Sequence, residues 1–383
     1  MTSDIYLILI LASILWLSPY ISGWIKIPTP AVEILIGSLL LTFGVIHKNA
    51  YFDLIAEVGF LYLMFLAGLE VDLQKILKAP QALIRAGMVF IFSIGILSVV
   101  VGYLLSFNII FIISMPLISV GLLATLSKMY GKETKWIEIA FIVGVLGEIV
   151  SIIALTVLDA ASEVGFSIEL LIKLSILFLF ILLIMLLYKA LDLFFWWKPE
   201  FKDKLMPHNS SSEQDIRMSI SLFFILIVVM IWLHLELALG AFIAGVAISA
   251  FFHHKHSLED KMSSFGFGFL VPLFFIHVGT TFDLSSLKLE GVLLNAILIT
   301  IFSILIKVVS ALVLHRFISY KESILVGLSL SMPLTLLVAV ATIGYQIQYI
   351  TLLNYYSLIL AAILEILVAM ILIKILTKKP KNT

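Results

Sequence analysis

The tetrapeptide SMPL occurs twice in this sequence, as Ser114–Leu117 and as Ser331–Leu334, 217 positions apart. The same offset carries Glu148 onto Glu365, and all four sites lie in apolar stretches. Each copy of the tetrapeptide contains a proline, which removes a helix hydrogen bond and clashes with the preceding turn. Two matches in the same order predict that the chain contains an internal repeat.

The amino-acid composition of the chain is that of a membrane protein. Apolar residues make up 62% of the 383 residues and charged residues only 13%, whereas soluble domains average about 25% charged residues. The mean hydropathy is +1.20. A net charge of zero gives no sign of nucleic-acid binding. The absence of cysteine excludes disulfides and thiolate chemistry.

Thirteen apolar segments approach the length of about 20 residues that a membrane-spanning helix needs. We therefore expect an all-α polytopic protein in a lipid bilayer, whose first span is retained because no basic residue precedes it. The thirteen predicted spans cover roughly residues 4–23, 30–46, 54–70, 82–105, 108–128, 136–158, 168–191, 218–234, 236–252, 265–281, 291–314, 322–343 and 351–376.

The distribution of lysine and arginine predicts the orientation of the chain. With thirteen spans, 20 of the 24 basic residues fall on one side of the membrane and three on the other. Because basic residues concentrate in cytoplasmic loops, we expect the N-terminus outside and the C-terminus in the cytoplasm. The expected location is the cell (inner) membrane.

The predicted organisation consists of two membrane halves, 1–191 and 218–376, joined by a cytoplasmic linker, 192–217, and followed by a short basic tail, 377–383. Matched helices lie seven spans apart, so they cross the membrane in opposite directions. Such inverted repeats are typical of secondary transporters, which place the substrate site near the midplane between the halves. We expect the two proline-containing spans to be discontinuous helices that cross there.

Three ionisable residues lie well inside predicted spans: Glu148, Lys307 and Glu365. Each costs at least about 2.5–3.5 kcal/mol at the bilayer centre, so such residues are candidates for function. Glu148 shares a helix face with Gly144 and Gly147, where another backbone can approach closely. A structural ion pair between the lysine and a glutamate remains the alternative.

The helix breaks at Pro116 and Pro333 are expected to free carbonyl groups that face a central site. Ser114, Ser331 and Thr335 are possible additional oxygen ligands. Glu33, near the predicted cytoplasmic end of the second span, is a possible entrance residue.

Four words across nearly the whole chain resemble the bacterial Kef/Nap-type monovalent cation:proton antiporter family. They are Pro28–Gly37 (PTPAVEILIG), Phe60–Leu73 (FLYLMFLAGLEVDL), Ala238–Ser249 (ALGAFIAGVAIS) and Pro272–Gly279 (PLFFIHVG). The resemblance implies the sodium/proton antiporter fold, a homodimer, and a mobile core that slides against a dimerisation domain. It places Glu148 on the essential acidic position and Lys307 on the basic one.

The sequence departs from that family pattern at Gly147, where Asp, Asn or Gln often precedes the essential acid, which is here a glutamate. The lysine therefore has Glu148 or Glu365 as a possible partner. We expect exchange of protons for Na⁺ or K⁺, with Glu148 binding proton or cation in competition and no cofactor. A cation channel or K⁺ efflux pathway, or a transporter of another small solute, remains an alternative. No catalytic spacing indicates an enzyme.

Overall fold

The computed structural model describes residues 2–25, 29–46, 49–69, 78–131, 133–164, 168–198, 213–233, 235, 237–252, 256–282 and 284–377. Within these ranges all regular structure is helical, which confirms the predicted all-α class. Eight of the described helices are long and apolar enough to cross a membrane, and one bent pair of helices makes a ninth. The protein is therefore a multi-pass membrane protein.

Each of the thirteen predicted spans coincides with a helix or a broken pair of helices. These are α1 (Thr2–Ile25), α2 (Thr29–Thr42), α3 (Ala50–Leu69), α5 (Gln81–Leu104), α6 (Ile109–Ser114) with α7 (Leu123–Tyr130), α8 (Lys135–Val164), α9 (Ile168–Trp197), α11 (Gln214–Leu233), α12 (Leu237–Phe252), α14 (Val271–Thr280), α15 (Val292–Ala311), α16 (Tyr320–Ser329) with α17 (Leu334–Gln346), and α18 (Leu352–Thr377).

The largest difference between a predicted and an observed boundary lies at the start of the tenth span. The helix that was expected to begin near residue 265 begins at His256, as α13 (His256–Phe265), and continues through the π-helical turn η1 (Gly266–Leu270) into α14. The charged run Glu259–Lys261 lowers the hydropathy of α13. Hydropathy therefore marks the start of the apolar part and not the start of the helix.

The chain forms two compact units. Unit 1 contains residues 1–59, 78–151 and 269–383, and unit 2 contains residues 60–77 and 152–268. The predicted halves 1–191 and 218–376 remain a prediction. Much of the predicted linker, residues 199–212, and residues 378–383 of the tail lie outside the described residues.

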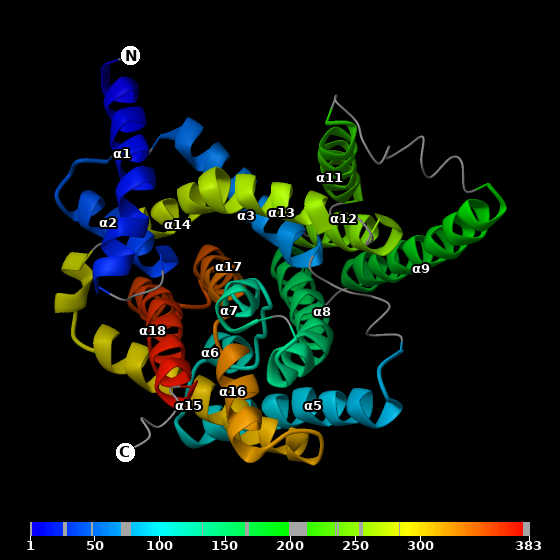
Figure 1. Ribbon diagram of the computed structural model, residues 1–383. Helices are drawn as coiled ribbons and strands as arrows, with labels where there is room; N and C mark the ends of the chain where they lie inside the picture. The colour runs from blue at the N-terminus through cyan, green and yellow to red at the C-terminus, as the bar shows by residue number, and fades with distance from the viewer. Residues whose placement is uncertain are drawn as a thin grey trace, which may run out of the picture. The chain divides into compact units, whose positions relative to one another are not determined.

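Unit 1 contains two broken helices. Residues 115–122 separate α6 from α7, and residues 330–333 separate α16 from α17, which are bent by 45°. Pro116 lies in the first break and Pro333 in the second, where it is the N-cap of α17. Within unit 1, α16 and α17 both pack against α18, as Figure 1 shows. Both predicted helix interruptions are therefore confirmed.

Glycines bring α2 and α14 of unit 1 into close backbone contact. A Cβ atom added to Gly37 would lie 2.1 Å from the carbonyl oxygen of Ile276, and one added to Gly279 would lie 2.1 Å from the carbonyl oxygen of Ile34. Any larger side chain at either position would push the two helices apart.

Unit 2 contains a second contact of the same kind, between its part of α3 and α12. A Cβ atom added to Gly68 would lie 2.1 Å from the carbonyl oxygen of Phe242, and one added to Gly245 would lie 2.0 Å from that of Phe65. Each of the four sequence segments that resemble the antiporter family therefore contains a glycine that takes part in one of these two helix contacts.

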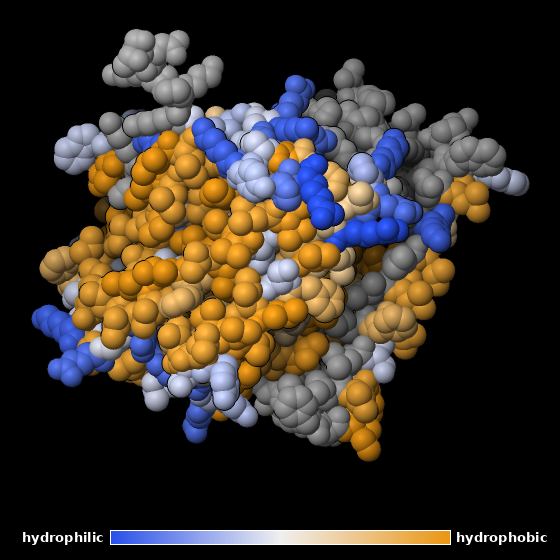
Figure 2. Space-filling model, turned by 90° about the horizontal axis from the view of Figure 1, so that it is seen from below, coloured by the Kyte–Doolittle hydropathy of each residue, from blue (hydrophilic) through white to orange (hydrophobic). Residues whose placement is uncertain are grey.

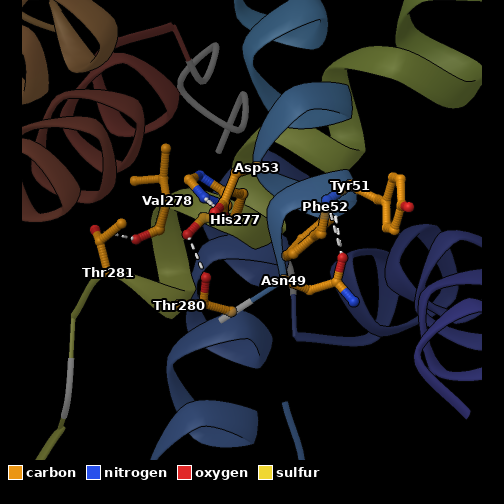
Figure 3. A network of polar contacts seen from close by, with 8 residues as sticks. All are labelled: Asn49, Tyr51, Phe52, Asp53, His277, Val278, Thr280 and Thr281. Carbon is orange, nitrogen blue, oxygen red and sulfur yellow. Dashed lines mark hydrogen bonds and ion pairs between the residues drawn. The ribbon is translucent and has the colours of Figure 1, made fainter. Parts of the chain in front are cut away.

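A polar cluster holds the beginning of α3 against α14 within unit 1 (Figure 3). Asp53 Oδ1 lies 2.9 Å from Nε2 of His277, whose ring packs edge-on against Phe52. The Asn49 side chain accepts hydrogen bonds from the backbone N–H groups of Tyr51 and Phe52 at 2.9 and 3.3 Å. It therefore caps the first turn of α3.

The outer surface carries large hydrophobic side chains, as expected of a protein surrounded by lipid. Trp24 is 86% exposed and Trp232 is 80% exposed. Figure 2 shows a face that is mostly hydrophobic, with hydrophilic side chains gathered along its upper edge and at its lower left.

Candidate functional site

Glu148 of α8 is fully buried and points to the first helix break. Its Oε1 accepts a hydrogen bond from Ser119 Oγ at 3.0 Å, and the backbone amide of Val120 lies close to the same carboxylate. Its Oε2 is buried and has no hydrogen-bond partner among the described residues. A buried carboxylate with a free oxygen is costly, so this oxygen is suited to hold a proton or a cation.

Two glycines of α8 allow the breaks to reach this carboxylate. A Cβ atom added to Gly147 would lie 2.5 Å from the Ile118 side chain. One added to Gly144 would lie 2.7 Å from Val120 of the first break and 2.8 Å from Leu330 of the second. The two breaks therefore meet on the face of α8 that carries Glu148, one turn away.

The first break is also fixed to α8 by hydrogen bonds. The backbone N–H of Ile118 donates to Ser151 Oγ at 2.9 Å, and this hydroxyl donates to the carbonyl oxygen of Gly147 at 2.8 Å. The Pro116 segment between α6 and α7 is thereby tied to α8 close to Glu148.

Lys307 of α15 is fully buried and lies near Glu365 of α18, with which its charge interacts. Its Nζ donates to Ser303 Oγ at 3.1 Å, and this hydroxyl lies 3.5 Å from the carbonyl oxygen of Met115 in the first break. Neither carboxylate oxygen of Glu365 has a hydrogen-bond partner among the described residues. Glu365 is the glutamate whose charge acts on the lysine, and an ion pair between the two stays a prediction.

The predicted oxygen ligands at the breaks are buried. The hydroxyl of Ser114 donates to Phe111 O at 2.8 Å and that of Ser331 donates to Gly327 O at 2.7 Å, so both use their hydrogen within their own helix turn. No hydrogen-bond donor to either hydroxyl oxygen lies among the described residues. Thr335 is 5% exposed in the first turn of α17.

Glu33, the predicted entrance residue, lies on α2 and is 2% exposed. Its Oε1 accepts a hydrogen bond from Ser18 Oγ of α1 at 2.8 Å. Its role at an entrance stays a prediction.

Sequence reasoning missed Ser119, the residue that contacts the Glu148 carboxylate. It lies in the irregular segment after Pro116, where helical periodicity gives no guide to direction. Its position only three residues after the proline was the available signal.

An all-helical membrane protein in which two discontinuous helices meet beside buried charged groups has the architecture of a secondary transporter. The pattern of the sodium/hydrogen exchanger transmembrane family matches residues 8–379. A Na⁺/H⁺ antiporter of Enterococcus hirae is 29% identical over 373 residues, which cover 94% of both chains. The YjbQ protein of Bacillus subtilis is 26% identical over 94% of this chain, which spans 60% of YjbQ.

A solved structure has the same fold. The sodium proton antiporter MjNhaP1 from Methanocaldococcus jannaschii superimposes with a TM-score of 0.68 and 14% identity, over 98% of this chain and 99% of that chain. The chain belongs to the sodium/hydrogen exchanger family, among the monovalent cation:proton antiporters.

Proposed function

We propose that this protein exchanges protons for a monovalent cation, Na⁺ or K⁺, by alternating access, and that Glu148 binds either ion. The observation that carries the proposal is the Oε2 of Glu148, a buried and unpartnered oxygen where both helix breaks meet α8. The names of the relatives support Na⁺ as the first cation to test.

Competition at one carboxylate is the proposed coupling mechanism. A proton and a cation cannot occupy the same oxygen pair, so each turnover in one direction carries the cation and in the other the proton. Ser119 Oγ and the carbonyl groups freed at the breaks would complete the oxygen shell of the cation, as unwound backbone does in other transporters. The apparent KM for the cation should fall as the pH rises, because fewer protons compete for Glu148.

Lys307 and Glu365 would act as a compensating pair. A buried charge is tolerated when it has a partner, and Glu365 supplies one for the lysine without using Glu148. Lys307 also reaches the first break through Ser303 and Met115. The pair would therefore hold α15 and α18 against that break and leave Glu148 free for the transported ion.

The two glycine contacts support the proposed inverted repeat. The contact of α2 with α14 joins predicted spans 2 and 10, and that of α3 with α12 joins spans 3 and 9. The predicted repeat matches each span with the span seven places away, so span 2 corresponds to span 9 and span 3 to span 10. The contact between spans 2 and 10 therefore corresponds to the contact between spans 9 and 3.

The proposal includes an N-terminus outside and a C-terminus in the cytoplasm of the cell membrane, on the evidence of the 20-to-3 division of basic residues. It also includes a homodimer, which the family resemblance suggests.

The test is transport in proteoliposomes with a pH dye inside. A proton gradient is imposed, and Na⁺, K⁺ or Li⁺ is then added with the membrane potential clamped. Glu148→Gln removes the proposed ion-binding charge with almost no change in shape. Glu290→Gln is the matched control, because Glu290 is exposed and outside the site.

Cation-dependent proton movement in the wild type and in Glu290→Gln, but not in folded Glu148→Gln, is the expected result. Exchange at the wild-type rate in Glu148→Gln would refute the role of that residue. Cation leak without any proton movement would show that the protein is a channel and not an exchanger.

A further inference from the structure

An open apolar groove of about 620 Å³ lies between α15, α16 and α18 of unit 1. Its walls include Ile301 and Leu305, which are about half exposed, and Val368 from α18. Thr300 is the one residue with a polar side chain in the lining, and its hydroxyl lies 3.4 Å from the carbonyl oxygen of Ala361, its acceptor. The groove therefore presents nothing that would favour a polar ligand.

One end of the groove carries positive charge. Lys321 lies one helical turn before the lining residue Ile324 of α16, and Lys374 directly precedes the lining residue Ile375 of α18. Both lysines are exposed, and neither forms an ion pair with a carboxylate in the described part of the chain. Glu322, which directly follows Lys321 in the sequence, forms a capping box with Ser319 instead.

This end has the character of a membrane–water interface. Tyr320 is 63% exposed and stacks on the ring of His315 at 4.9 Å between centroids. Tyrosine is enriched where a protein leaves the hydrocarbon for the headgroup region. From this end the apolar lining runs along the membrane-spanning helices toward Ile297 of α15.

We propose that this groove binds an anionic phospholipid, with an acyl chain along α15, α16 and α18 and the phosphate between Lys321 and Lys374. The volume is in the range of sites for small molecules. The apolar lining suits an acyl chain, and two unpaired lysines at the interface suit an anionic headgroup.

The position of the site gives the lipid a way to act on transport. Lys307 lies between the lining residues Ile304 and Val308, and Glu365 follows the lining residue Leu364. The acyl chain would contact the outer faces of the two helices that carry this buried pair on their inner faces. The binding of the lipid itself is independent of which ion is transported.

The test uses the full chain in detergent and native mass spectrometry. Phosphatidylglycerol and phosphatidylcholine with identical acyl chains are added separately. The headgroup variant is Lys321→Gln with Lys374→Gln, and its matched control is Lys135→Gln with Lys288→Gln, at two exposed lysines elsewhere. Val368→Phe fills the groove, and a melting curve of each variant shows that it is folded.

We expect phosphatidylglycerol to bind more tightly than phosphatidylcholine. Each removed lysine should weaken phosphatidylglycerol binding by about fivefold, and the control pair should leave it unchanged. Val368→Phe should weaken both lipids. Equal binding of the two lipids, or equal loss in the headgroup variant and the control, would overturn the anionic headgroup site. Unchanged binding by folded Val368→Phe would overturn the groove.

Discussion

Replacing Gly279 by alanine should disrupt the contact between α2 and α14. The added Cβ atom would lie 2.1 Å from the carbonyl oxygen of Ile34 and 2.9 Å from the Cα atom of Gly37. An ordinary contact begins at 3.4 Å, so the two backbones must separate by about 1.3 Å along the Cβ–O direction. Both obstacles are helix backbone, which cannot rotate away as a side chain can.

The expected cost follows from this geometry. Overpacking typically costs 1–3 kcal/mol, and we expect Gly279→Ala near about 3 kcal/mol because no side-chain adjustment relieves it. At Gly95 of α5, where nothing lies within 4 Å of an added Cβ, alanine should instead stabilise by up to about 1 kcal/mol through its better helix propensity. Glycine to alanine is therefore expected to destabilise the protein at position 279 and to stabilise it at position 95.

Thermal unfolding of the purified protein in detergent measures this difference. Gly279→Ala should melt below the wild type and Gly95→Ala at or above it. Gly245→Ala, whose Cβ would lie 2.0 Å from the carbonyl oxygen of Phe65 in the second glycine contact, should lower the melting temperature as Gly279→Ala does. A Gly279→Ala protein as stable as the wild type would show that close backbone contact does not hold α2 against α14.

Three further predictions concern the polar groups. Ser119→Ala removes the hydroxyl on Glu148 Oε1, so it should raise the apparent KM for the cation in proteoliposomes more than it lowers kcat; an unchanged KM would contradict the ligand role. Lys307→Met should destabilise by about 3–5 kcal/mol because it leaves Glu365 buried and unpaired, whereas Lys307→Met with Glu365→Met should recover most of that loss; additive losses in thermal unfolding would argue against the pair. Asp53→Asn should lower stability by at most about 1 kcal/mol, because Asp53 is 54% exposed in its pair with His277, and a collapse of the protein would disprove this estimate.

The sequence predicted those features that depend on composition along one segment. The thirteen spans follow from hydropathy, and the helix interruptions follow from Pro116 and Pro333, because proline removes a helix hydrogen bond wherever the helix goes. The burial of Glu148, Lys307 and Glu365, each 0% exposed, was expected from their apolar surroundings. Their roles in transport stay a prediction.

The sequence could not predict features that depend on which segments contact one another in the fold. The pairing of Gly37 with Gly279 joins residues far apart in the chain, and nothing in either helix alone specifies its partner. Ser119 lies in a break without periodicity, so its direction toward Glu148 could not be read from spacing. The start of a helix at His256 could not be predicted, because the charged turn Glu259–Lys261 lowers the local hydropathy. Hydropathy indicates which residues suit the bilayer and not where a helix begins.

The buried charges also predict the electrical character of the exchange. The proposed pairing of Lys307 with Glu365, whose opposite charges attract each other, leaves the negative charge of Glu148 as the charge that a transported ion neutralises at the helix breaks. One proton or one monovalent cation neutralises it equally, so the site carries the same net charge with either ion bound. Exchange should therefore be one for one and electroneutral, and its rate in proteoliposomes should be the same at zero potential and at an imposed K⁺ diffusion potential. A rate that changes severalfold with the potential would mean that Lys307 or Glu365 also loses or gains a proton during transport, and that the two do not stay paired.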